Sequence, residues 1–294
     1  MAKNPFDQFS KQFFEAFLSP YGEVRINYEV PGESRYVDIF FTPSQDITTI
    51  PESLGILRRI ASRPCLIEPF RNQPKLREVS SCVSKLLFVQ LDFERQAQRN
   101  QKTLSEEELP LVWILTPTTS DNFLETYGAT LRSDWLDGMY FSPKGYYTVF
   151  VAIHSLPSTP ETLLFRLFGK GRVQQQAVRE ILNLPETDNR RSVILQLLST
   201  WKISIEVTGE SEEKDEDLAM IISEAYQQWE EATKRLGMEQ GQRISVENLL
   251  KARFGEVDEQ LSAIVPKVLA TPIDEYTPLL LQLSREELIA HFRL

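Results

Sequence analysis

The chain has 294 residues, of which 41% are hydrophobic and 25% are charged, and its formal net charge is -10. These values are typical of a globular protein with a sizeable core, and they exclude wholesale disorder. No apolar run approaches the roughly 18 residues that a membrane-spanning helix needs. Two cysteines and two histidines are too few for a disulfide framework or a histidine-rich metal site. We therefore expect a cytoplasmic protein with no signal peptide and no membrane partner.

The N-terminal residues predict a helix followed by a β-hairpin. One face of the helix carries phenylalanines spaced by four residues, at Phe9, Phe13 and Phe17. Residues 23–30 alternate between polar and apolar side chains, as in a half-buried strand, and Pro31-Gly32 predicts the turn. Residues 35–41 then form the return strand.

The following segments alternate between helix and strand patterns. The predicted helices and strands are, in chain order, helix 51–62, strand 65–70, helix 76–101, strand 109–117, helix 120–128 and strand 146–154. In the long helix, helical spacing predicts an apolar face made of Val79, Val83, Leu86, Leu87 and Leu91. The fold class is therefore α/β, or more strictly α+β, with a mixed sheet flanked by helices.

The composition changes after residue 157, and we expect an all-helical C-terminal half. Residues 158–236 predict helices with a break near Pro185 and an acidic linker at 206–217. Gly237 and Gly241 bracket an expected hinge, and 243–294 predicts a small domain of three or four short helices. The predicted domains are therefore 1–157, 158–236 and 243–294.

Charge is unevenly distributed along the chain. Residues 58–102 contain ten Lys or Arg against four acids, a local net charge of +6, so the rest of the chain carries -16. A basic segment can follow the phosphate backbone of DNA. The alternative is that solvated helix faces simply carry lysine and arginine.

Two carboxylates interrupt apolar strand patterns. Asp38 lies between Val37 and Ile39, and Glu68 shares a strand face with Leu66 and Phe70. Burying an unpaired carboxylate is costly, so two of them on neighbouring strands suggest a shared cation. Mg²⁺ suits such a pair because it prefers oxygen ligands and keeps several waters. We expect the two carboxylates to converge to on the order of 4–6 Å. The alternative is that arginines, such as Arg25, Arg35 or Arg71, neutralise both acids without a metal.

This order of elements, with VPGESRYVDIFFTP followed by PCLIEPFRNQP, resembles the PD-(D/E)XK nuclease superfamily. More narrowly, it resembles the bacterial Rpn-like proteins, labelled recombination-promoting nucleases or transposases. The last fifty residues resemble the small helical domain often attached to them. The resemblance implies a restriction-endonuclease-like sheet and a Mg²⁺-dependent DNA endonuclease.

Carried onto this chain, the resemblance makes Asp38 and Glu68 the metal ligands. The family's catalytic lysine is expected two residues after the acid, where this chain has Phe70. Arg71, Lys75 or Lys85 are the candidates to replace it, although arginine is a poor proton acceptor. Glu15 stands where some relatives place an auxiliary metal-binding acid, but its angle from the phenylalanine face favours solvent exposure.

Other chemical signals are weaker. FGKGRVQQQ (168–176) lacks the spacing of a phosphate-binding loop and is interpreted as a helix break. His154 has no nucleophilic partner, and Cys65 and Cys82 are interpreted as packing residues.

Two functions stay open. The first is a DNA endonuclease with Asp38, Glu68 and a displaced cationic residue. The second is a non-catalytic interaction or scaffold protein on a degenerate nuclease fold. In that case the helical C-terminal half would bind a protein partner or a second copy.

Overall fold

The structure is a computed structural model that describes residues 5–29, 36–44, 47–208 and 216–292. It divides into two compact units, Met1–Tyr226 and Gln227–Leu294. The sequence predicts different boundaries, after 157 and between 236 and 243. Within the described ranges, no helix is both long enough and apolar enough to cross a membrane.

The first unit is built on one mixed sheet of seven strands, in the order β1-β2-β3-β4-β7-β6-β5. Strands β1 to β3 form an antiparallel meander, whereas β3, β4 and β7 are parallel to one another. The strands are β1 (Gly22–Glu29), β2 (Tyr36–Pro43), β3 (Cys65–Pro69), β4 (Leu111–Thr116), β5 (Thr130–Leu131), β6 (Met139–Phe141) and β7 (Thr148–Ala152). The expected mixed sheet is confirmed. The short strands β5 and β6 are not predicted by the sequence, and the expected turn at Pro31-Gly32 lies outside the described residues.

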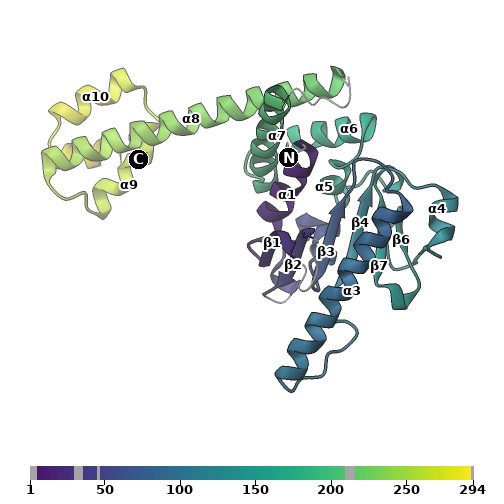
Figure 1. Cartoon of the computed structure of the whole chain (residues 1–294). Helices are drawn as coiled ribbons and strands as arrows, with labels where there is room; N and C mark the ends of the chain where they lie inside the picture. Colours follow the sequence, from purple (N-terminus) through teal and green to yellow (C-terminus); the bar gives the residue numbers. More distant parts are fainter. Residues whose placement is uncertain (1–4, 30–35, 45–46, 209–215, 293–294) are drawn as a thin grey trace. The chain divides into compact units, whose positions relative to one another are not determined.

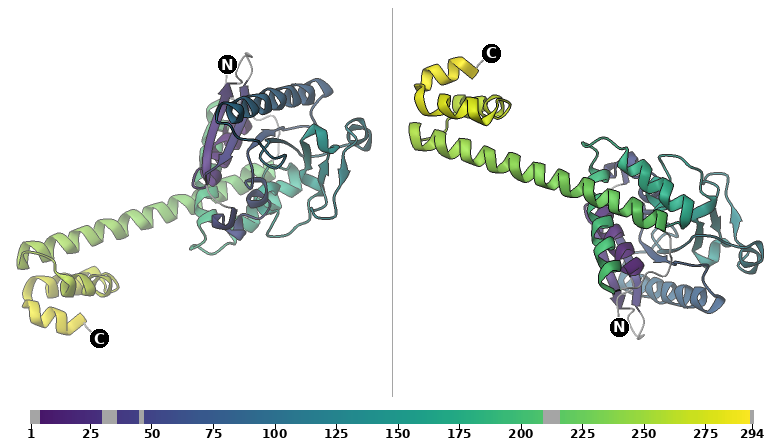
Figure 2. Two further views of the ribbon diagram at one scale, coloured as in Figure 1. Left: turned by 90° about the horizontal axis from the view of Figure 1, so that it is seen from below. Right: turned by 90° about the horizontal axis from the view of Figure 1, so that it is seen from above.

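Helices cover both faces of this sheet (Figures 1 and 2). One face carries α3 and α4, whose side chains share a core with Phe40, Leu66, Val112 and Phe150. The other face carries α1 and the helices that follow β7. The helices of the first unit are α1 (Pro5–Leu18), α2 (Ile56–Ile60), α3 (Leu76–Arg99), α4 (Asp121–Thr126), α5 (Leu163–Arg166), α6 (Gly171–Leu182) and α7 (Asn189–Thr208).

The expected helix 51–62 is divided at Gly55. A short 3₁₀ turn covers Glu52–Leu54 and α2 begins at Ile56, because Gly55 has a φ of 55° that only glycine adopts readily. A Cβ atom on Gly55 would lie 2.0 Å from the carbonyl oxygen of Glu161. Backbone contact between two distant segments therefore requires glycine here.

The buried face of α3 differs from the predicted one. Leu87 and Leu91 are exposed, and the buried face instead includes Lys85 and Gln90. Gln90 donates a hydrogen bond of 2.9 Å from Nε2 to the carbonyl oxygen of Pro110. Two polar side chains with partners thus replace two leucines on the side of the helix that faces the sheet.

The phenylalanine face of α1 packs against the helices after residue 158. Phe168, which follows α5, contacts the rings of Phe6, Phe9, Phe13 and Phe14 at centroid distances of 4.8–6.3 Å. Phe9 also stacks on Trp201 of α7 at 4.7 Å. The N-terminal helix and the helices of residues 163–208 therefore share one core.

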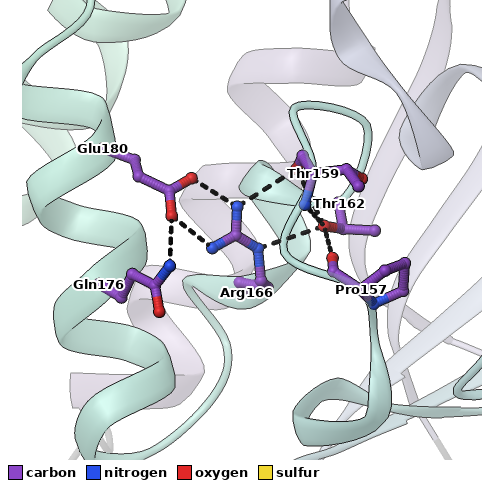
Figure 3. A network of polar contacts seen from close by, with 6 residues as sticks. All are labelled: Pro157, Thr159, Thr162, Arg166, Gln176 and Glu180. Atoms are coloured by element: carbon purple, nitrogen blue, oxygen red, sulfur yellow. Dashed lines mark hydrogen bonds and ion pairs between the residues drawn. The ribbon is translucent and has the colours of Figure 1, made fainter.

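A buried arginine fastens α5 to α6 (Figure 3). Arg166 is 1% exposed and makes a bidentate pair with Glu180, at 2.8 Å from Nη1 and 2.6 Å from Nη2. Its Nε donates to Thr162 and its Nη2 also donates to the carbonyl oxygen of Thr159. Each guanidinium nitrogen has a partner within the chain, so this cluster is interpreted as structural.

The second unit is helical, as expected. It contains the end of α8 (Glu216–Phe254), then α9 (Glu259–Leu269), α10 (Ile273–Gln282) and α11 (Arg285–Phe292). Its own core includes Val246, Leu250, Leu261, Val265 and Leu280. Helix α8 is continuous through Gly237 and Gly241, so the expected hinge is wrong. A glycine costs only about 1 kcal/mol in a helix, which the neighbouring helix-forming residues offset. Of the expected acidic linker, residues 209–215 lie outside the described residues.

We predict that Phe168→Ala lowers the free energy of unfolding of the first unit by about 3–5 kcal/mol, because it removes a fully buried ring from four others. Urea unfolding followed by tryptophan fluorescence measures this change. The control is Tyr146→Ala, because the Tyr146 side chain is 62% exposed. An effect no larger than that of Tyr146→Ala would show that the helices after 158 do not share the core of α1.

Candidate functional site

Asp38 and Glu68 lie opposite each other on adjacent strands. Ile39 pairs with Ile67 and Phe40 with Leu66 in the antiparallel register of β2 and β3, which places Asp38 across from Glu68. The charge of Asp38 acts on the pKa of Glu68, so the two side chains lie close enough to interact. Their solvent exposure differs, since the side chain of Asp38 is 35% exposed and that of Glu68 only 3%. The two acids therefore face each other on adjacent strands, as expected, while the separation of 4–6 Å between their carboxyl groups stays a prediction.

Lysines from two helices approach this pair. Lys85 of α3 lies with Nζ 2.5 Å from Glu68 Oε1 and donates a hydrogen bond of 3.1 Å to the carbonyl oxygen of Tyr36. Lys11 of α1 lies with Nζ 3.8 Å from Asp38 Oδ1 and 2.8 Å from Asp7 Oδ1. Lys85 and Lys11 therefore bring two ammonium groups, one from α3 and one from α1, to the carboxyl pair.

Burial and the repulsion between two adjacent carboxylates both favour a proton on this pair. Burial, and then the charge of Asp38, raise the pKa of Glu68 to about 8, despite the opposing effect of Lys85. Burial also raises the pKa of Asp38, while Lys11 and Lys85 act to lower it. For Lys85, burial lowers the pKa, but the charge and hydrogen bond of Glu68 outweigh burial and raise it above its ordinary value. At neutral pH we expect one proton on the carboxyl pair and a charged Lys85.

The other candidate residues lie elsewhere. Arg71 donates from Nη1 to the carbonyl oxygen of Gly169 at 3.1 Å and stacks over the Phe6 ring at 5.2 Å. Lys75 is exposed at the start of α3, where its backbone N–H donates to Glu78. Glu15 is exposed and does not join the acids, as its angle on the helix indicates. The described contacts of Arg71 and Lys75 are made with other residues and Glu15 does not join the acids, so a role of these three residues in the site stays a prediction.

Arginines do not neutralise the acid pair in the described part of the chain. Arg25 forms a bidentate pair with Glu23 at 2.8 Å, Arg71 lies at Gly169, and Arg35 falls outside the described residues. Lys85 and Lys11 take the role that the alternative gave to arginine. Lys85 can reach Glu68 because it lies on the face of α3 that packs on β2 and β3.

Phe70 packs against the same core as α3 and is partly buried. The helix therefore presents an ammonium group to Glu68, while the position two residues after Glu68 holds an apolar ring. Of the three candidates for a displaced cationic residue, Lys85 is the one whose ion pair with Glu68 is described.

The basic segment 58–102 is not a continuous basic surface. Several of its cations make contacts within the chain: Arg58 with Glu52, Arg59 with Asp134, Arg63 with Leu109, Arg71 with Gly169 and Lys85 with Glu68. The exposed remainder, Lys75, Arg77, Arg95, Arg99 and Lys102, lies at or near α3. Any basic surface for DNA would therefore be confined to that helix and its ends.

The chemistry of the acid pair fits Mg²⁺, which commonly binds one or two carboxylates and keeps several waters. Asp38 and Glu68 would hold it. Within the described residues no cluster of three or more His, Cys, Asp or Glu side chains could hold a metal ion. A cation here would therefore depend on two protein ligands and on the displacement of the proton on the carboxyl pair.

The weaker sequence signals prove structural. The expected helix break in 168–176 lies at its start, because residues 167–170 separate α5 from α6 and residues 171–176 belong to α6. His154 accepts a hydrogen bond at Nε2 from the backbone N–H of Lys170 at 3.0 Å. Cys65 and Cys82 are buried, and burial raises the pKa of both thiols, so neither is an activated nucleophile.

Comparison with protein-family models, with curated proteins and with solved structures finds no match to the chain. The resemblance to Rpn-like proteins and to the PD-(D/E)XK superfamily therefore stays a prediction. The functional proposal therefore rests on the arrangement of Asp38, Glu68 and Lys85.

Sequence reasoning did not single out Lys11 or Asp7. Their separation of four residues predicts an ion pair on one side of the first helix. That pattern is common on helix surfaces, and it does not indicate that Asp38 lies beside the same ammonium. Only the packing of α1 against the sheet brings the three residues together.

We predict that the stability advantage of Glu68→Gln over the parent protein grows as pH rises from about 5 to 8. The ordinary pKa is 4.5 and the native value is about 8, so the folded protein keeps a proton that the unfolded chain has lost. The contribution of Glu68 to the free energy of unfolding therefore falls with pH, by about 2–4 kcal/mol over this range. Urea unfolding of both proteins at several pH values measures the difference. A difference that is constant with pH would contradict a protonated Glu68.

Proposed function

We propose that the chain is a Mg²⁺-dependent endonuclease of the PD-(D/E)XK type, acting on phosphodiester bonds in DNA. The observation that supports this most is the group formed by Asp38, Glu68 and Lys85, with two facing carboxyl groups and an ammonium 2.5 Å from one of them. The element order α1-β1-β2-β3-α3-β4, with β4 parallel to β3, also agrees with what the resemblance implies.

Each side chain has a chemical role in this proposal. Asp38 and Glu68 bind the cation, which supplies an acidic water and neutralises phosphate charge. Lys85 stays protonated because Glu68 raises its pKa, so it cannot act as the base. Its ammonium instead stabilises negative charge on a phosphate oxygen. Lys85 thus replaces the lysine that the family pattern places at Phe70.

The second candidate is a non-catalytic scaffold on the same fold, and one observation favours it. Glu68 is 2% exposed and its pKa is raised to about 8, so at neutral pH it can remain a neutral acid paired with Lys85. An acid in that state contributes to the core and does not recruit a cation. Partner binding would then fall to the helical C-terminal half.

We predict that Lys85→Met lowers the rate of plasmid cleavage by about 10²-fold or more, because it removes the ammonium that stabilises the phosphate charge. Asp38→Ala should abolish cleavage, since it removes the exposed cation ligand. Lys144→Met is the control, because Lys144 is an exposed lysine outside the segment 58–102 that pairs with Glu106, and it should leave the rate within about twofold of the parent.

Restoring a lysine at the family's position sharpens this test. Phe70→Lys in the Lys85→Met background should recover part of the activity, because residue 70 shares a strand face with Glu68. Thermal unfolding must be followed in parallel, since Phe70 packs against the core. If the folded parent binds Mg²⁺ yet never cuts plasmid DNA, the scaffold is favoured over the enzyme.

A further inference from the structure

The exposed side of the acid pair is occupied by a lysine. Asp38 is the carboxyl group that solvent reaches, since its side chain is 35% exposed against 3% for Glu68. Lys11 Nζ lies 3.8 Å from Asp38 Oδ1, and the side chain of Lys11 is itself only 16% exposed. An ion arriving from solvent to bind Asp38 therefore meets the ammonium of Lys11 beside its ligand.

Lys11 is shared between two partly exposed carboxylates, those of Asp7 and Asp38. Its Nζ lies 2.8 Å from Asp7 Oδ1, in an ion pair between residues four apart on α1. Asp7 is thus the nearer partner and Asp38 the more distant one. A lysine side chain reaches both by small torsional changes, so the strength of its contact with Asp38 depends on how firmly Asp7 holds it.

We propose that Lys11 is a resident counter-ion of Asp38 that opposes the binding of a divalent cation, and that Asp7 limits this opposition by holding the ammonium away. The inference rests on the proposed function only in taking Asp38 and Glu68 as the cation ligands. A divalent cation and an ammonium at one carboxylate repel each other, so the cation binds Asp38 only as Lys11 shifts toward Asp7. The Asp7–Lys11 pair therefore sets the cation concentration at which the site fills.

The proposed role of the Asp7–Lys11 pair can be distinguished from that of an ordinary surface ion pair by its effect on cation binding. A pair that only stabilises α1 predicts that removing either partner slightly weakens the helix and leaves cation binding unchanged. If Lys11 opposes the cation and Asp7 holds Lys11 away, removing Lys11 and removing Asp7 should change the affinity for the cation in opposite directions. Removing Lys11 relieves the repulsion of the cation, whereas removing the carboxylate of Asp7 leaves the Lys11 ammonium free to stay at Asp38.

The test is isothermal titration of the full chain with Mg²⁺ and Mn²⁺ at low ionic strength. We expect Lys11→Gln to bind the cations about 3–10-fold more tightly than the parent, and Asp7→Asn to bind them more weakly by a similar factor. Both differences should shrink at high salt, which screens exposed charges. Lys144→Gln is the matched control, because it also removes a lysine from an ion pair, with Glu106, and should leave the affinity unchanged. Circular dichroism confirms that each variant is folded.

The outcomes separate this inference from the proposed function. Tighter binding by Lys11→Gln with weaker binding by Asp7→Asn supports it, as does binding that appears only when Lys11 is removed. If the parent binds cations and neither variant changes the affinity, the counter-ion is rejected while the metal site stands. If neither the parent nor Lys11→Gln binds a cation, the metal site and the counter-ion are both rejected.

Discussion

The contact between Glu68 and Lys85 fixes where α3 lies on the sheet. Both side chains are buried, and removing the Glu68 side chain altogether would leave the ammonium of Lys85 without its carboxyl partner in the core. Lys85 also donates to Tyr36 O on β2, and Gln90 on the same face of α3 donates to Pro110 O just before β4. Apolar packing alone would tolerate a helix that slides along the sheet. These directional contacts hold α3 at one position over β2, β3 and β4.

Local patterns predicted much of the fold. The spacing of Phe9, Phe13 and Phe17 predicted α1, and the apolar runs predicted β3, β4 and β7 close to their observed bounds. Strands β5 and β6 have two and three residues, too few to show a period. The hinge predicted at Gly237 and Gly241 was wrong, because a glycine weakens a helix without breaking it when the neighbouring residues favour helix.

The sequence indicated the two acids of the site more clearly than its two lysines. Asp38 and Glu68 stand out because a charge in an apolar strand pattern needs a partner. The face of α3 was ambiguous, since Val79, Val83, Leu86, Leu87 and Leu91 fit an apolar stripe that excludes Lys85. Choosing the correct face requires the tertiary partners, Glu68 and Tyr36, which no periodicity reveals. Lys11 shows the same limit, because its contact with Asp38 depends on the packing of α1.

The charges of the site residues balance one another. Three carboxyl groups, of Asp7, Asp38 and Glu68, face two ammonium groups, of Lys11 and Lys85, and one proton makes the group neutral. A neutral cluster is compatible with burial in a protein of net charge -10. On the proposed function, adding a divalent cation disturbs this balance. An anionic phosphate would restore it, so cation and substrate are expected to favour each other's binding.

The stacking of Phe9 on Trp201 has a consequence for how the protein is made. A ribosome adding 5–20 residues per second needs roughly 10–40 s to extend the chain from the first of these rings to the second. During that time the phenylalanine face of α1 lacks its final cover. Lys11 is carried by the same helix, so it reaches Asp38 in its final geometry only after α7 has emerged. Between the synthesis of Glu68 and that of Trp201, the nascent chain therefore carries both acids before Lys11 has reached its final place beside Asp38.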